Sequence, residues 1–366
     1  MNYLKMLSGI TTFCLTGIVG SAATEGTLQP GPETSVEKAY ELRMHGKADQ
    51  ARVMLEAMLQ EDSDDATAWY ELARTKHHMG LGNPRELMNN LGDLETTINE
   101  AASKDPENLS YAYYNAQLTM FCAYASLMRQ QPDAREKVQK VIEAYEAVLE
   151  LNPECVEALL DLTEILGLLD TDMGGDLARA KAYAGQLVEI DPVYAAKARQ
   201  FLLEKDADRI EYWEEVLDAH PDNADVLEEL GTACMMEGET EKAVGYTEMA
   251  MEKDPGKTLL LLNLARYHIM SAMRNKEDMD TLLPVGEKYL TAYIESGPVP
   301  PLKAYALGIS GRVKWMQEDK EGSANIREQA NTLDPFYSKA TGVPSMALFA
   351  KPGDPGLHHS YWTRPF

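Results

Sequence analysis

Histidine and methionine side chains that could bind a metal ion occur in three short clusters. His77-His78 and His358-His359 are adjacent pairs, and Met235-Met236 directly follow Cys234. Thioether and imidazole ligands favour copper, so a metal or small-ligand carrier is one interpretation of the chain. However, most of the 19 methionines fall at helical core spacing, where Met fills gaps between other side chains. We therefore predict no metal site and no cofactor.

Adjacent acidic residues are the candidates for acid-base catalysis. Two such pairs are Glu214-Glu215 and Glu228-Glu229. General acid and base catalysis needs two carboxylates that face each other across a cleft and differ in pKa, whereas neighbours on a helix point about 100° apart. The sequence also contains no Gly-x-Ser-x-Gly, His-Glu-x-x-His or Gly-rich phosphate-binding motif. We therefore expect no enzyme activity.

The composition is that of an acidic, helix-rich globular protein. The chain has 366 residues, with 59 Asp plus Glu against 34 Lys plus Arg, and a formal net charge of −25. Such a charge repels phosphate backbones and anionic lipid headgroups, so neither nucleic acid nor a membrane surface is a predicted partner. Aromatic residues make up only 8%, which leaves Leu, Ala and Met to build the core, as in packed helices. Three of the cysteines, Cys122, Cys155 and Cys234, are expected to be small buried residues.

Residues 1–23 have the layout of a secretory signal peptide. A single Lys5 precedes an apolar run from Met6 to Val19, and small residues follow at 20–23. No later stretch approaches the roughly 18 consecutive apolar residues of a membrane span, so the mature chain is not expected to insert in a membrane. We expect cleavage near residues 22–24, a Pro/Gly-rich linker over 24–34, and a periplasmic or secreted protein.

A helix-turn-helix pattern is clearest in residues 224–256. The first helix carries an apolar stripe, a glycine supplies the turn, the second helix carries small residues, and an Asp-Pro pair ends the unit. The residues concerned are Leu227, Leu230, Gly231 and Cys234, then Gly238, then Ala243 and Ala250, then Asp254-Pro255.

The same unit recurs along the chain. Prolines that end successive units stand at positions 106, 153, 192, 221 and 255, separated by 29 to 47 residues. This pattern resembles the tetratricopeptide repeat (TPR) family. The resemblance implies an all-α fold: a right-handed α-α superhelix, or TPR solenoid, of about eight helix-turn-helix units over residues 35–335.

In that family the first helices of successive units line the concave face, where ligands bind, most of them peptide segments. The resemblance therefore assigns partner binding to outward-pointing positions on these helices. They are Tyr70, Arg74, His77, Tyr113, Gln117, Arg266, Tyr305, Arg312 and Trp315. Tyr and Trp supply large contact areas, and Arg holds carboxylates in a bidentate manner. The predicted function is that of a non-catalytic scaffold or assembly factor that binds a protein or peptide.

A second interpretation is a periplasmic accessory subunit of a solute transporter or secretion system. Transporter-associated proteins with this repeat architecture are similar to this chain in their leader, irregular turns and long aromatic first helices, such as the segment Tyr111 to Tyr114. The sequence leaves the identity of the partner and the oligomeric state open.

The tail, residues 336–366, combines six aromatic residues with four prolines. Disordered tails are usually poor in aromatic residues, so we expect this one to dock on the solenoid. The predicted tail covers the last helix pair and runs back along the array, where His358, His359 and Trp362 enter the groove. The alternative is a free recognition tail that ends in Arg364-Pro365-Phe366.

Overall fold

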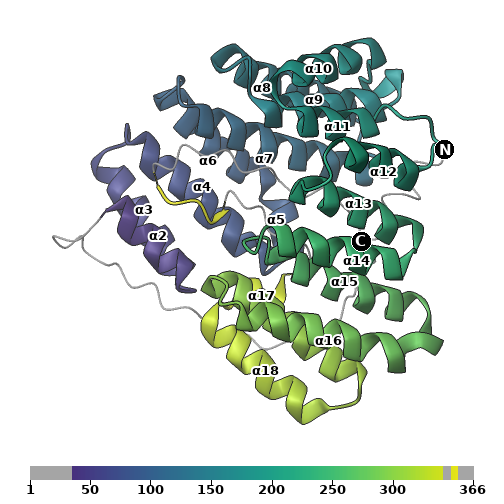
Figure 1. Cartoon of the computed structure of the whole chain (residues 1–366). Coiled ribbons are helices and arrows are strands. Elements are labelled where there is room, and N and C mark those ends of the chain that lie inside the picture. The colour runs from purple at the N-terminus through teal and green to yellow at the C-terminus, as the bar shows by residue number, and fades with distance from the viewer. Residues whose placement is uncertain (1–34, 341–347, 353–366) are drawn as a thin grey trace.

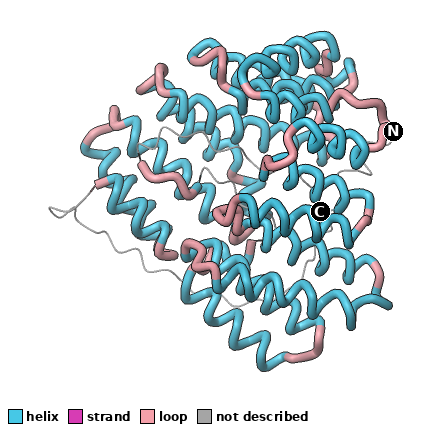
Figure 2. The backbone as a smooth tube through the Cα atoms, in the orientation of Figure 1, coloured by secondary structure: helices cyan, strands magenta, loops and turns pink. Residues whose placement is uncertain are grey.

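The computed structural model describes residues 35–340 and 348–352. Within these ranges the regular structure consists of α-helices and short 3-10 segments, without a strand, and Figure 2 shows the helices joined by short loops. The described residues contain no helix with the length and apolar character of a membrane span. The predicted leader and linker, together with His358, His359 and Trp362 of the tail, lie outside the described residues.

The α-helices of this region form eight consecutive helix-turn-helix pairs (Figure 1). They are α2 (Val36–Met44) with α3 (Ala48–Glu61), α4 (Ala66–Leu81) with α6 (Leu91–Lys104), α7 (Leu109–Met128) with α8 (Ala134–Leu151), α9 (Val156–Leu168) with α10 (Leu177–Ile190), α11 (Pro192–Gln200) with α12 (Arg209–Ala219), α13 (Ala224–Glu237) with α14 (Thr240–Lys253), α15 (Leu259–Arg274) with α16 (Met279–Glu295), and α17 (Pro300–Met316) with α18 (Lys320–Leu333). The predicted all-α solenoid is confirmed.

Short elements fill some of the turns. Helix α5 (Pro84–Asn89) lies in the turn between α4 and α6. The 3-10 segments are η1 (Thr171–Met173), η2 (Lys276–Asp278) and η3 (Tyr337–Lys339), and η3 follows the last helix pair.

Capping residues explain where the helices of the clearest unit begin and end. The Asn223 side chain accepts hydrogen bonds from the backbone N–H groups of Asp225 (2.9 Å) and Val226 (3.1 Å), which otherwise have no partner within the helix. At the other end of α13, Gly238 has φ +82°, a left-handed conformation that costs a residue with a Cβ atom free energy. The sequence therefore fixes both ends of this helix locally.

Small residues let the two helices of a pair approach closely. A Cβ atom on Gly231 of α13 would lie 2.6 Å from Oγ1 of Thr247 on α14. Ala243 and Ala250 of α14 are fully buried against the neighbouring helices. The buried apolar residues form one large cluster, which includes Tyr70, Leu230 and Leu348, and four smaller clusters along the array. Cys122, Cys155 and Cys234 are buried free thiols.

The array doubles back on itself, so that its last pair contacts its first two pairs. Figure 1 shows the purple first pair beside the yellow-green last pair. A Cβ atom on Gly46, in the turn between α2 and α3, would lie 2.1 Å from the carbonyl oxygen of Leu333 in α18. Similarly, a Cβ atom on Gly82 would lie 2.8 Å from Cα of Phe336. The two ends of the repeat region are therefore in direct backbone contact.

Candidate functional site

A buried network of charged side chains lies where the first, second and last pairs meet. Its centre is Glu71 of α4, whose side chain is fully buried. The carboxylate accepts hydrogen bonds from Nε of Arg43 on α2 (2.7 Å) and from Nε of Arg74 on α4 (2.9 Å). Both arginine side chains are fully buried as well. The Arg43–Glu71 contact therefore joins α2 to α4, and the Arg74–Glu71 contact within α4 adds a second charge-assisted bond to the same carboxylate.

Helix geometry and charge explain this arrangement. Glu71 and Arg74 stand three residues apart on α4, so both side chains lie on the same face of the helix. Burial opposes ionisation of Glu71, but Arg43 and Arg74 outweigh that effect and lower the pKa of its carboxyl below the ordinary value. The carboxylate is therefore charged at neutral pH and compensates the two guanidinium groups.

The same two arginines hold a short segment of the tail. Nη1 of Arg43 donates to the carbonyl oxygen of Leu348 (2.5 Å), and Nη1 of Arg74 donates to that of Ala350 (2.7 Å). Between them, the Tyr40 hydroxyl donates to the carbonyl oxygen of Phe349 (2.9 Å). Three consecutive carbonyl groups of the tail thus accept hydrogen bonds from side chains of α2 and α4. Figure 1 shows this segment in yellow beside α4.

A second buried contact, between a histidine and a carboxylate, joins α4 to the end of the last pair. Nε2 of His78 lies 2.7 Å from Oδ2 of Asp334, and both side chains are fully buried. The other carboxylate oxygen of Asp334 accepts the backbone N–H groups of Phe336 and Tyr337, both at 2.9 Å. The Tyr337 ring packs 4.4 Å from the His78 ring, centroid to centroid. Asp334 therefore orients the start of the tail while it binds the second repeat.

His77 belongs to the same region and makes the stability of the fold depend on pH. Its Nδ1 atom lies 2.9 Å from the Tyr114 hydroxyl. Burial, with His78 and Arg43 acting in the same direction, lowers the pKa of His77 to about 3, against 6.5 when it is unperturbed. The unfolded chain therefore binds a proton below pH 6.5 that the folded chain does not take up until near pH 3, so stability is lost as the pH falls through this window.

When the pH falls from 7 to 5, we expect His77 alone to lower the free energy of unfolding by about 2 kcal/mol. The loss amounts to about 1.4 kcal/mol for each pH unit below pH 6.5. Urea unfolding of the wild type and of His77→Gln at both pH values isolates the effect, because all other titrating groups are common to the two proteins. The stability advantage of the wild type should shrink by about that amount at pH 5. An advantage that stays constant with pH would show that His77 titrates normally in the fold.

A buried carboxyl on α9 is a separate polar centre. The Tyr113 hydroxyl donates to Oδ2 of Asp161 at 2.9 Å. Burial, reinforced by Glu164, raises the pKa of Asp161 well above its ordinary value. The described residues hold no group of three or more His, Cys, Asp or Glu side chains arranged to bind a metal ion. Asp161 is thus a buried carboxyl group whose hydrogen bond to Tyr113 joins α7 to α9.

The nine residues assigned to partner binding from the sequence differ widely in exposure. Arg312 and Trp315 of α17 are exposed, with 53% of the Trp315 surface accessible, and Arg266 of α15 is half-buried. The other six are buried: Tyr70, Arg74, His77, Tyr113, Gln117 and Tyr305. An open face lined by all nine is therefore wrong for this structure. The role of these residues in partner binding stays a prediction.

The reason for the difference is packing between successive first helices and against the tail. Tyr70 stacks on Tyr111 of the next pair, with ring centroids 4.6 Å apart, and Arg74 lies between Glu71 and the tail. Tyr40, Arg43 and Glu71 were not among the residues predicted from the sequence. A charged residue at a helix position whose neighbours are apolar is a sign of a buried ion pair, and Glu71 next to Leu72 and Ala73 fits that description.

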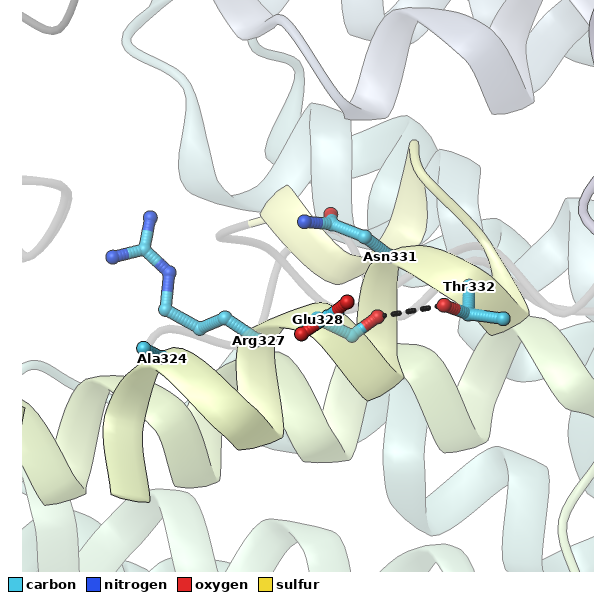
Figure 3. A pocket seen from close by; sticks show the side chains of 5 residues that line it. All are labelled: Ala324, Arg327, Glu328, Asn331 and Thr332. Carbon is cyan, nitrogen blue, oxygen red and sulfur yellow. Dashed lines mark hydrogen bonds between the residues drawn. The ribbon is translucent and has the colours of Figure 1, made fainter. Parts of the chain in front are cut away.

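A shallow hollow occurs on the outside of the last pair, and Figure 3 shows the residues around it. All of them belong to α18: Ala324, Arg327, Glu328, Asn331 and Thr332. The Thr332 hydroxyl donates to the backbone carbonyl of Glu328 at 2.9 Å, within the same helix. Because a single helix supplies its lining, the hollow encloses no ligand, and we assign no site to it.

Comparison with known proteins gives a match for one part of the chain. Residues 210–257, which span α12 to α14 and the turn after α14, match the family described as tetratricopeptide repeat. No curated protein matches the sequence.

Similar solved structures include the following three. The thermophilic TPR protein TTC0263 of Thermus thermophilus is 17% identical, with 64% of this chain and 98% of that chain covered and a TM-score of 0.37. A tetratricopeptide repeat protein from Parabacteroides merdae is 15% identical over 81% of this chain and 91% of that chain, with a TM-score of 0.32. Human IFIT1, solved as a dimer with PPP-AAAA, is 16% identical over 84% and 80% of the two chains, with a TM-score of 0.38.

Proposed function

We propose that this chain, a member of the tetratricopeptide repeat family, is an exported scaffold that binds a peptide segment of a partner protein on the face formed by its first helices. The fold is that of a protein-interaction scaffold. Its net charge of −25 favours a protein partner over nucleic acid.

One observation carries the proposal. Four carbonyl oxygens in the described part of the tail accept hydrogen bonds from side chains of first helices. The donors are Arg312 of α17 to Ala340 (3.3 Å), Arg43 and Tyr40 of α2 to Leu348 and Phe349, and Arg74 of α4 to Ala350. Contacts to backbone carbonyls do not depend on the sequence of the bound peptide. The first helices therefore supply the chemistry that an extended peptide segment needs.

The three members of the predicted site that are not buried, Arg266, Arg312 and Trp315, provide the test. We expect peptides selected from a displayed random library to bind the wild-type chain, and the triple variant Arg266→Ala, Arg312→Ala, Trp315→Ala to bind them at least tenfold more weakly. Trp and Arg dominate the free energy of many interfaces, and tenfold corresponds to about 1.4 kcal/mol. Fluorescence anisotropy with a labelled selected peptide measures the affinity.

A matched triple variant on second helices serves as the control. Arg135 of α8, Lys181 of α10 and Met249 of α14 are exposed, and their replacement by Ala should leave the affinity unchanged. Unaltered binding by the first-helix variant, or an equal loss in both variants, would place recognition elsewhere and refute the proposed face.

Export is the second part of the proposal, and it rests on the sequence of residues 1–23. We expect the protein isolated from its native host to begin near Ala23 or Thr24, because small residues at 20–23 follow the apolar run. Intact mass spectrometry of the envelope or secreted fraction measures the start. A full-length chain that retains Met1 in a cytosolic fraction would exclude export.

A further inference from the structure

We propose that Tyr40, Arg43 and Arg74 form a recognition site for a peptide with an aliphatic, an aromatic and a small residue in succession, and that residues 348–350 occupy it as an intramolecular ligand. We call these three residues the tail-binding site. This inference rests on the proposed function and names the sequence chemistry that one end of the binding face selects.

The backbone of the bound segment is held along its whole length. The three donors of the tail-binding site contact three successive carbonyl oxygens at 2.5 to 2.9 Å. Two of the donors are guanidinium groups, which form stronger hydrogen bonds than neutral donors. Both groups are fully buried under the segment, and they keep one fixed orientation because Glu71 binds the Nε atom of each. The donors are therefore preorganised for a peptide in this position.

The side chains of the segment provide selectivity. Leu348 is fully buried and belongs to the main apolar core together with Tyr337. The Phe349 ring packs edge-on against Tyr337, with centroids 5.7 Å apart and an interplanar angle of 62°. Ala350 is 9% exposed, so a larger side chain would have to displace its neighbours. The site thus fits the order aliphatic, aromatic, small.

Attachment to the same chain gives the tail an advantage over any free peptide. A tethered ligand acts at an effective concentration in the millimolar range, so a partner with the same three residues must displace it. The apparent affinity for a free peptide equals the intrinsic affinity multiplied by the fraction of molecules in which the site is empty. Loosening the tail without removing it should therefore raise the affinity for that peptide.

The experiment uses the full chain and a fluorescent peptide with the sequence PSMALFAKPG, which is residues 344–353 of this protein. The variant L348Q/F349Q keeps every backbone carbonyl but gives up the two apolar side chains. We expect it to bind the peptide at least tenfold more tightly than the wild type does. A peptide with the same two Gln substitutions should not bind either protein.

Tyr40→Phe in the L348Q/F349Q background tests the site directly. Loss of one hydroxyl donor should weaken peptide binding about threefold to tenfold, the equivalent of one hydrogen bond. Tyr212→Phe is the matched control, because that hydroxyl also donates to a backbone carbonyl, Ala196 at 2.8 Å, but lies on α12. It should leave the affinity unchanged.

Two results would overturn the inference: no binding of the peptide to the L348Q/F349Q chain, or equal affinity for the variant and the wild type. Circular dichroism checks that the variant is folded, and Phe349→Gln alone replaces it if it is not, because Phe349 is only half-buried. Either result leaves the proposed function standing, since that is tested with other peptides and with Arg266, Arg312 and Trp315.

Discussion

Glu71→Gln is expected to lower the free energy of unfolding by about 3–5 kcal/mol, although Gln has nearly the same shape as Glu. The wild-type carboxylate compensates two fully buried guanidinium groups at 2.7 and 2.9 Å. Gln offers one acceptor oxygen and no charge, so Arg43 and Arg74 would remain buried close together with their positive charges uncompensated. Urea unfolding at pH 7, followed by circular dichroism, measures the loss.

An exposed ion pair of the same type gives the control. Arg52 and Glu56 lie four residues apart on α3, with 41% and 39% of their side-chain surfaces exposed. Solvent-exposed pairs of this kind contribute about 0–1 kcal/mol, so Glu56→Gln should have a small effect. A similar small loss for Glu71→Gln would mean that water reaches the arginines and that the network is not closed off by the tail.

The helix pairs could be predicted from the sequence because their determinants are local. Asn223 and Gly238 mark the ends of α13, and the buried Ala243 and Ala250 stand on one face of α14. A pattern that is repeated along the chain is recognised several times over, so errors in a single unit do not alter the result.

The charged centre and the contact between the ends could not be predicted in the same way. Arg43 and Leu348 are hydrogen-bonded across 305 residues of sequence, and His78 and Asp334 across 256. Residue spacing and periodicity do not predict such contacts, because the contacts depend on the summed rotation between all the successive helix pairs that separate the two residues. For the same reason, the burial of Tyr70 and Arg74 could not be seen in the sequence: what covers them comes from other pairs and from the tail.

The path of the tail could also be predicted only in part from the sequence. The predicted tail covers the last helix pair, because the end of a solenoid exposes an apolar face, and runs back along the array. In the structure, Tyr337 packs against α4 as well as α17, and residues 348–350 lie on α2 and α4. The outer helix α18 is instead largely polar at its surface, so it needs no such cover.

Gly46→Ala is expected to be about 1–3 kcal/mol more destabilising than Gly238→Ala, and the difference measures the contact between the first and last pairs. Both glycines follow the first helix of a pair and have similar left-handed conformations, with φ +73° and +82°. A Cβ atom costs about 1–2 kcal/mol in that conformation at either position. At Gly238 the new methyl group would have no neighbour within 4 Å, whereas at Gly46 it would lie 2.1 Å from the Leu333 carbonyl oxygen.

Backbone atoms of α18 cannot yield locally, so the methyl group at position 46 has to push the last pair away from the first. That movement would also strain the hydrogen bonds from α2 and α4 to residues 348–350. Urea unfolding of both variants at pH 7 gives the two losses, and small-angle scattering should show a larger radius of gyration for Gly46→Ala alone. Equal losses with equal radii would mean that the first and last pairs stand apart in solution, because only their contact distinguishes the two glycines.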